Sequence, residues 1–216
     1  MNLQDKLTGF AMLGATWVMW VLVGLSVGGL AVALERAVYL LRTSDDVRRV
    51  KADLLGLLRR GDLPAARARL AASRSFEASV AAAGLTEPDE GAASAEERIA
   101  GAAQLAKLRM ERRLAFLGTL GNNAPFLGLL GTVIGIIRAF HELNDSAGKV
   151  TAGLMAQVGE ALVATAIGIL VALPAIAAYN AFQRVIKTRL ARADALARDV
   201  MAHLKAERPA SPARAA

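Results

Sequence analysis

Three long stretches without a single charged side chain dominate this sequence. They run from Leu7 to Leu34, from Leu114 to Ile137 and from Ala161 to Gln183. A helix rises about 1.5 Å per residue, so roughly 20 apolar residues cross a bilayer core of about 30 Å. Each stretch is long enough, and the chain is 55% hydrophobic although 21% of it is charged. The predicted fold class is therefore an all-α membrane protein with three transmembrane helices.

The distribution of basic residues predicts how these helices are oriented. The segment from Arg42 to Arg113 holds fourteen of the 26 lysines and arginines and the tail after Gln183 holds eight, whereas the N-terminal arm has only Lys6. Lysine and arginine accumulate on the cytoplasmic side of membrane proteins. The N-terminus is therefore expected outside the cytoplasm, with the long loop and the C-terminus inside it.

This topology divides the chain into six segments. They are an N-terminal arm with the first transmembrane helix (1–41), a helical cytoplasmic loop (42–113), the second transmembrane helix (114–140), a short outer loop (141–153), the third transmembrane helix (154–182) and a basic cytoplasmic helix with its tail (183–216). The first span is expected to be a retained anchor, because its apolar run exceeds the roughly 7–15 residues of a signal-peptide core.

Composition argues against several other classes of protein. The predicted topology accounts for the net charge of +7, and Phe76 is the only aromatic side chain in the two basic regions, so nucleic-acid binding is not expected. Cysteine is absent and the two histidines, His141 and His203, lie far apart, so we predict no metal site and no bound cofactor. No nucleophile, base and orienting group can be assembled, so an enzyme is not expected.

Helical patterns continue through the cytoplasmic loop. Apolar residues recur at helical spacing from Asp45 to Arg60, and Asp62, followed by a proline, predicts the start of the next helix. Ser94 and Glu97 have the spacing of a capping box, which predicts a helix that continues without a break into the second span. The third helix is expected to run on into the tail as far as Glu207.

Small residues recur every four positions within the predicted spans. Such spacing lets helix backbones approach closely, either within one chain or between copies of it. Two prolines also lie inside spans two and three, where each removes a backbone donor and can bend its helix. The repeats are Gly24 and Gly28, Gly131 and Gly135, and Ala164, Gly168 and Ala172; the residues predicted to pack or hinge the helices are Pro125, Gly131, Gly135, Gly168 and Pro174.

Glu160 is the only charged residue between Lys149 and Arg184. An ionised side chain in the hydrocarbon costs roughly 2.5–3.5 kcal/mol at a helix centre, so an intramembrane acid is usually functional. Glu160 and Thr132 both fall in the outer half of the membrane, and Thr165 lies about 140° around the helix from Glu160 and about one turn deeper. All three can border one polar cavity. Alternatively, Glu160 only marks the outer end of its span.

A second alternative concerns the two threonines. A threonine inside a membrane helix commonly donates its hydroxyl to the carbonyl of the preceding turn. On the residues alone, that local role is the simpler expectation for Thr132 and Thr165.

Three short segments are more specific than any of these patterns. They read APFLGLLGTVIGI at 124–136, GEALVATAIG at 159–168 and PAIAAYN at 174–180. In order and spacing they resemble the ExbB/TolQ branch of the MotA/TolQ/ExbB proton channel family. The resemblance is strongest from Leu114 to Phe182 and weak over the N-terminal arm, the interior of the loop and the tail.

The resemblance implies a stator subunit of a motor in the bacterial inner membrane, with a periplasmic N-terminus. Such subunits form pentamers around a dimer of a single-span partner of the ExbD/TolR kind, whose transmembrane Asp carries the proton. The motor uses the proton motive force for outer-membrane transport or envelope maintenance, through a TonB-like or TolA-like protein. Position by position, Glu160 matches the pore glutamate of the family, and Thr132 and Thr165 match two threonines beside the proton path.

Two departures keep other machines open. Residues 155–158 lack the Pro-Gly-Ile-Ala-like lead of typical ExbB and TolQ chains, and the tail is more basic. A related stator for gliding motility therefore stays an alternative, whereas a flagellar MotA subunit would have four spans. From another class, a passive membrane scaffold or a small ion transporter is also possible, although three spans without an inverted repeat are few for a transporter.

Overall fold

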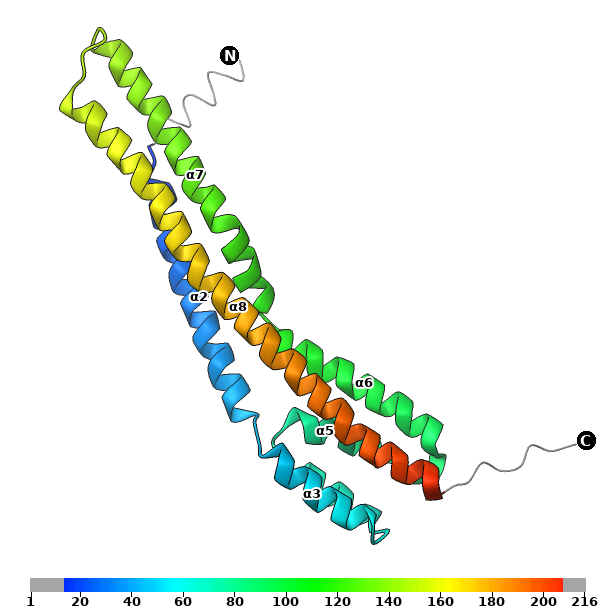
Figure 1. Ribbon diagram of the computed structural model, residues 1–216. Coiled ribbons are helices and arrows are strands. Elements are labelled where there is room, and N and C mark those ends of the chain that lie inside the picture. Colours follow the sequence, from blue (N-terminus) through cyan, green and yellow to red (C-terminus); the bar gives the residue numbers. More distant parts are fainter. Residues whose placement is uncertain (1–13, 208–216) are drawn as a thin grey trace, which may run out of the picture. The chain divides into compact units, whose positions relative to one another are not determined.

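The computed structural model describes residues 14–207 and shows helices through nearly all of that range, with no strand in it (Figure 1). The all-α prediction is confirmed for this range, and the N-terminal arm and the tail after Glu207 lie outside it. The elements are α2 (Thr16–Arg42), α3 (Val47–Leu58), α4 (Leu63–Ala71), α5 (Phe76–Ala83), the 3₁₀ helix η1 (Pro88–Glu90), α6 (Ala92–Glu111), α7 (Leu114–Asp145) and α8 (Ala152–Glu207).

The described chain forms two compact units. The first contains residues 14–35 and 113–181, and the second contains residues 36–112 and 182–207. Three of the described helices, α2, α7 and α8, are long and apolar enough to cross a membrane, which confirms the three predicted spans as helices. Both α7 and α8 extend past the charge-free stretches, so residues 146–151 alone connect them.

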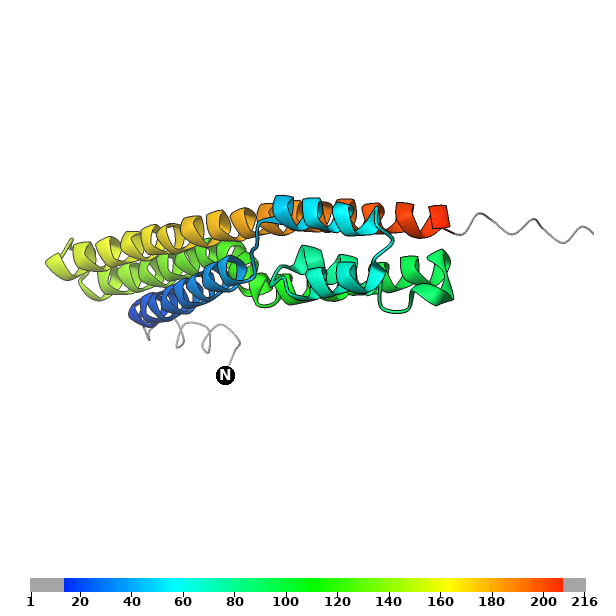
Figure 2. The same ribbon diagram turned by 90° about the horizontal axis from the view of Figure 1, so that it is seen from below.

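The first unit is a bundle of α2, α7 and α8, which lie side by side in both ribbon views (Figure 2). Its buried core takes Val18 and Leu22 from α2, Leu120 and Ile134 from α7, and a valine and two alanines from α8. Many large apolar side chains remain exposed on all three helices, among them Trp20, Leu30, Phe126, Leu162, Leu170 and Leu173. An apolar exterior around a small apolar core is what a helix bundle in lipid requires.

Backbone atoms of α7 and α8 come very close at two glycines. A Cβ atom on Gly128 would lie 2.8 Å from the carbonyl oxygen of Ala164, and one on Gly168 would lie 2.7 Å from that of Ala124. Gly131 and Gly135 also lie at this contact, because a Cβ on either would meet the Cβ of an alanine on α8. Residues without a side chain therefore set the distance between α7 and α8.

The second unit encloses its own apolar core between α3, α4, α5, α6 and the C-terminal part of α8. Asp46, Asp62 and Ser75 cap the N-termini of α3, α4 and α5 by accepting hydrogen bonds from backbone amides. The predicted helices from Asp45 and from Asp62 are thus confirmed. The buried residues of the core are Val50, Leu54, Leu58, Ala66, Leu70, Ala78, Ala81, Leu85, Ala95, Leu196, Val200, Met201 and Leu204.

The start of α6 differs from the prediction. Ser94 is not an N-cap, because the helix begins at Ala92 after Gly91, whose φ of 92° suits a residue without a side chain. The Ser94 hydroxyl donates instead to Glu90 Oε2 (2.7 Å), and Arg98 Nη1 donates to the same oxygen (2.5 Å). The bond from Ser94 has the larger effect and the bond from Arg98 the next, and together they lower the pKa of Glu90 to about 2. The capping box was wrong because Glu90 competes for Ser94.

The predicted continuous helix into the second span is also wrong. It breaks between α6 and α7, where Arg112 is extended and Arg113 has a φ of 65°. Arg36, only 3% exposed, donates to the carbonyl oxygen of Arg109 in the last turn of α6 (3.3 Å). Because a side chain from another helix satisfies the end of α6, no glycine or proline is needed there. The local sequence therefore gave no sign that the helix ends.

Arg189 on α8 caps the C-terminal end of α2. Its side chain is 8% exposed, and it donates to the carbonyl oxygens of Leu40 (2.8 Å) and Thr43 (3.2 Å) and to the Thr43 hydroxyl (3.2 Å). Two nitrogens of the planar guanidinium share the three acceptors, Nη1 bonding to Thr43 and Nη2 to Leu40.

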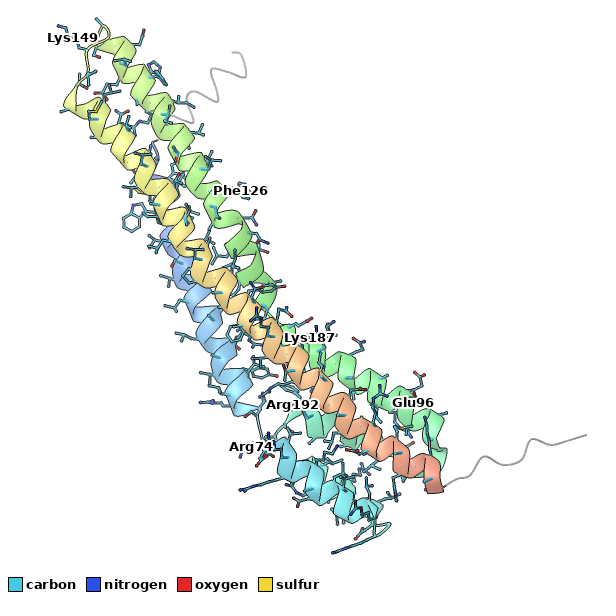
Figure 3. All side chains as sticks on the ribbon, viewed as in Figure 1. Arg74, Glu96, Phe126, Lys149, Lys187 and Arg192 are labelled. Carbon is cyan, nitrogen blue, oxygen red and sulfur yellow. The ribbon has the colours of Figure 1, made fainter. Side chains whose placement is uncertain are left out.

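Arg189→Met is expected to lower the free energy of unfolding by about 1–2 kcal/mol, since it leaves buried carbonyl groups without a donor. Thermal unfolding of the detergent-purified protein, followed by circular dichroism, measures this loss. Lys187→Met, two residues away at an exposed position of α8 (Figure 3), is the matched control and should change stability by less than about 0.5 kcal/mol. Equal stability of the two variants would contradict a capping role for Arg189.

Candidate functional site

Two threonines meet where α7 and α8 pack together. The hydroxyl groups of Thr132 and Thr165 are hydrogen-bonded to each other, and both lie within hydrogen-bond distance of the carbonyl oxygen of Gly128 (3.3 and 3.2 Å). Thr132 Oγ1 is also 3.2 Å from the carbonyl oxygen of Ala161. Each hydroxyl has one proton and can accept another bond. Either threonine can therefore donate to the other while its partner donates to the backbone.

The close glycine contact brings this pair together. A Cβ atom on Gly128 would lie 3.0 Å from the Cα of Thr165, so a larger residue at position 128 would push Thr165 away. A bond to the carbonyl of the preceding turn, the role predicted from the residues alone, accounts for only some of these contacts. Thr132 does lie near the carbonyl of its preceding turn, but it also bonds across to α8.

Glu160 has a different partner. Its carboxylate oxygen Oε1 accepts a hydrogen bond from the hydroxyl of Thr16 at the start of α2 (2.7 Å). The Glu160 side chain is half-buried and Thr16 is exposed. The structure therefore brings Thr132 and Thr165 together, whereas Glu160 is hydrogen-bonded to α2 instead of to either of these threonines. Sequence analysis missed Thr16, because a threonine at the edge of an apolar helix has no distinguishing pattern.

A second carboxylate joins the ends of α7 and α8. Glu142 accepts hydrogen bonds from the Thr151 hydroxyl (2.5 Å) and from the amide nitrogen Nε2 of Gln157. Thr151 in turn accepts the backbone amide of Leu154, which caps α8 (3.0 Å). Gln157 lies one turn before Glu160 on the same helix. Glu142 was also missed, although the acid at the end of a span followed by Thr151 could have suggested an interhelical cap.

The two prolines predicted as hinges lie within continuous helices. Pro125 does not end α7, and Pro174 does not end α8. Pro174 borders a cavity of about 330 Å³ among α2, α7 and α8, which Gly29 and Leu117 also line. Proline cannot donate to the carbonyl four residues earlier, so each helix has a local weakness at that point.

The chemistry available to these side chains is proton binding and hydrogen bonding. Carboxylates take up and release protons, and a hydroxyl that donates and accepts together can pass a proton along. Within residues 14–207, no group of three or more histidines, cysteines or acids is arranged to hold a metal ion. The polar groups of the site come from α2, α7 and α8, and Glu160 and Glu142 are its acids.

Several known proteins are similar to part of this chain. An ExbB-like biopolymer transport protein of Helicobacter pylori is 45% identical over 78 residues, which cover 36% of this chain and 52% of the relative. The biopolymer transport protein ExbB of Neisseria gonorrhoeae is 41% identical over 96 residues, 44% of each chain. The Tol-Pal system protein TolQ of Pseudomonas aeruginosa is 43% identical over 74 residues, 34% of this chain and 32% of the relative.

The matched segments thus span about half the length of the Helicobacter relative and less of the other two. The broader match is to a family described as the MotA/TolQ/ExbB proton channel family, over residues 72–195. This range is more than half of the 216 residues and contains Thr132, Glu160 and Thr165. The chain therefore belongs to the MotA/TolQ/ExbB proton channel family.

Proposed function

We propose that this chain is the channel-forming stator subunit of a proton-driven motor in the bacterial inner membrane. The observation that carries the proposal is the group of polar side chains inside the bundle. The hydroxyls of Thr132 and Thr165 are hydrogen-bonded to each other across α7 and α8. Glu160, the one acid in the apolar part of α8, is hydrogen-bonded to Thr16 on α2. In this proposal the N-terminus is periplasmic, and residues 42–113 and the C-terminal part of α8 are cytoplasmic. Several copies, five by analogy with the family, surround a dimer of the partner.

The partner in this proposal is a single-span protein of the ExbD/TolR kind with an Asp in its transmembrane helix. A proton that neutralises this Asp lowers the cost of moving it past an apolar interface. Each charge that crosses the field gains about 2.3 kcal/mol per 100 mV. Repeated proton uptake and release would then turn the partner inside the ring of this chain.

The work done is either energised outer-membrane transport, through a TonB-like protein, or envelope maintenance, through a TolA-like protein. The names of the relatives cover both, since two are biopolymer transport proteins and one belongs to the Tol-Pal system. Glu160, Thr132 and Thr165 are the proposed proton pathway in either machine.

Proton flux into liposomes tests this function directly. The full chain, purified with an ExbD/TolR-like partner from the same organism, is reconstituted, and a potassium gradient with valinomycin sets the membrane voltage. A pH-sensitive dye inside the liposomes should report inward proton flux that depends on the voltage and on the partner's Asp. A passive scaffold would give the dye response of empty liposomes at every voltage.

Thr16→Val is expected to reduce this flux about tenfold. The substitution keeps the shape of the side chain but removes the hydroxyl that holds Glu160. Tenfold corresponds to about 1.4 kcal/mol, near the lower end of the value of a hydrogen bond to a charged group. Thr16→Ser keeps the hydroxyl and should restore at least half of the flux. A Thr16→Val protein as active as Thr16→Ser would show that this hydrogen bond is dispensable.

A further inference from the structure

A pocket in the second unit plays no part in the proposed proton pathway. It has a volume of about 380 Å³, and its walls come from the residues that follow α2, from Glu77 on α5 and from five residues of α8. Three of its lining residues are arginines and two are acids. All of these residues belong to the second unit.

Two of the arginines that line this pocket form a basic stripe on α8. Arg184, Thr188 and Arg192 follow one another at intervals of four residues, so they lie along one face of the helix. Both arginines are exposed, and neither guanidinium has a hydrogen-bond or ion-pair partner among residues 14–207. Figure 3 labels Arg192, together with Lys187, on this part of α8. Two free guanidinium groups beside one pocket favour an anionic ligand.

The remaining charges of the pocket are already engaged or buried. Arg189, only 8% exposed, donates to the end of α2, and Glu77, which also lines the pocket, is 2% exposed. Asp45 accepts hydrogen bonds from the Ser73 hydroxyl (2.6 Å) and the Asp46 amide (2.8 Å), and these lower its pKa. With three arginines against two carboxylates, the pocket offers one net positive charge.

The position of the pocket along α8 indicates where the ligand comes from. Arg184 is the first charged residue after the charge-free stretch Ala161–Gln183. Thr188 lies about 6 Å further along the helix and Arg192 about 12 Å further. The headgroup layer is roughly 5–8 Å deep on each side of the bilayer core, and the long side chain of Arg192 can reach back into it. In the proposed topology, the basic stripe therefore begins at the level of the lipid headgroups.

We propose that this pocket binds the phosphodiester headgroup of an anionic phospholipid. Arg184 and Arg192 hold the phosphate oxygens, because a guanidinium presents two parallel N–H groups to such an anion. The hydroxyl of Ser44, which lines the same pocket, is the third donor. One monoanionic phosphodiester matches the net charge of the pocket, and basic pockets at this membrane level are suited to anionic headgroups.

Native mass spectrometry of the full chain in detergent tests this site. The protein is titrated with phosphatidylglycerol and, as the zwitterionic comparison, with phosphatidylcholine. The double variant R184Q/R192Q should lower the affinity for phosphatidylglycerol about tenfold or more. R184K/R192K keeps the charges but loses the paired N–H groups, so it should lower the affinity by less. The matched control is R59Q/R60Q, which removes the same charge from two exposed arginines outside the pocket and should bind like the unchanged protein.

Circular dichroism confirms that the variants keep their helices, and the single variants R184Q and R192Q replace the double variant if it does not fold. Equal losses in R184Q/R192Q and R59Q/R60Q, or no preference between the two lipids, would overturn the proposal. Millimolar inorganic phosphate should not displace phosphatidylglycerol; complete displacement would make free phosphate the ligand and overturn the assignment to lipid. If R184Q/R192Q weakens association between copies of the chain and leaves lipid binding unchanged, the surface is a subunit contact instead.

Discussion

Glu160→Gln is expected to abolish proton-driven flux, by at least about a hundredfold, while the complex with the partner still assembles. Glutamine has nearly the size of glutamate, and its carbonyl oxygen can still accept the hydrogen bond from Thr16. The amide group of glutamine cannot take up or release a proton near neutral pH. The measurement is dye-reported flux in liposomes, with co-purification of the partner to show that assembly is intact.

Two further substitutions make this result specific. Glu160→Asp keeps a carboxylate on a shorter side chain and should retain part of the flux. Glu142→Gln, the matched carboxyl-to-amide change at the end of α7, should retain most of it. The glutamine keeps one oxygen to accept one of the two bonds from Thr151 and Gln157, and its amide group can donate to the other side chain. Full activity of Glu160→Gln would reject Glu160 as an essential proton carrier and favour the scaffold. Loss only in Glu142→Gln would place that carrier at position 142.

Much of the fold follows from local sequence. The three spans follow from their length and lack of charge, and the short helices of the second unit follow from Asp46 and Asp62 before apolar residues at helical spacing. Two predictions were wrong, the capping box at Ser94 and the unbroken helix from α6 into α7, and both failed for the same reason. Ser94 is held by Glu90, and the end of α6 is held by Arg36 from a distant part of the chain. A side chain from another element outweighed the local pattern in both places.

The candidate site could be predicted only in part. Spacing along α8 fixes the angle between Glu160 and Thr165, but it does not fix how α8 is rotated against α2 and α7. Thr16 and Glu160 are 144 positions apart in sequence, and no pattern in either helix connects them. The pairing of Thr132 with Thr165 depends on backbone approach at Gly128, which repeated small residues only suggest. The same repeat at Gly24 faces open space within the described chain.

This difference between the two glycine repeats leads to the second large effect. Gly168→Ala is expected to lower the free energy of unfolding by about 3 kcal/mol, the upper part of the range for overpacked cores. The new Cβ would lie 2.7 Å from the carbonyl oxygen of Ala124 and 3.0 Å from the Cα of Gly128. Both are backbone atoms, so no side-chain rotation can relieve the contact. The helices must separate, which also pulls Thr165 from Thr132 and should reduce proton flux.

Gly24→Ala is the matched control in the same bundle. Its Cβ would have no neighbour within 4 Å, and alanine is a better helix former than glycine by about 1 kcal/mol. Thermal unfolding in detergent should therefore show Gly24→Ala unchanged or slightly stabilised and Gly168→Ala clearly destabilised. Equal stability of the two variants would mean that α7 and α8 do not approach this closely. The hydroxyl pair would then need another cause than the absence of side chains at Gly128 and Gly168.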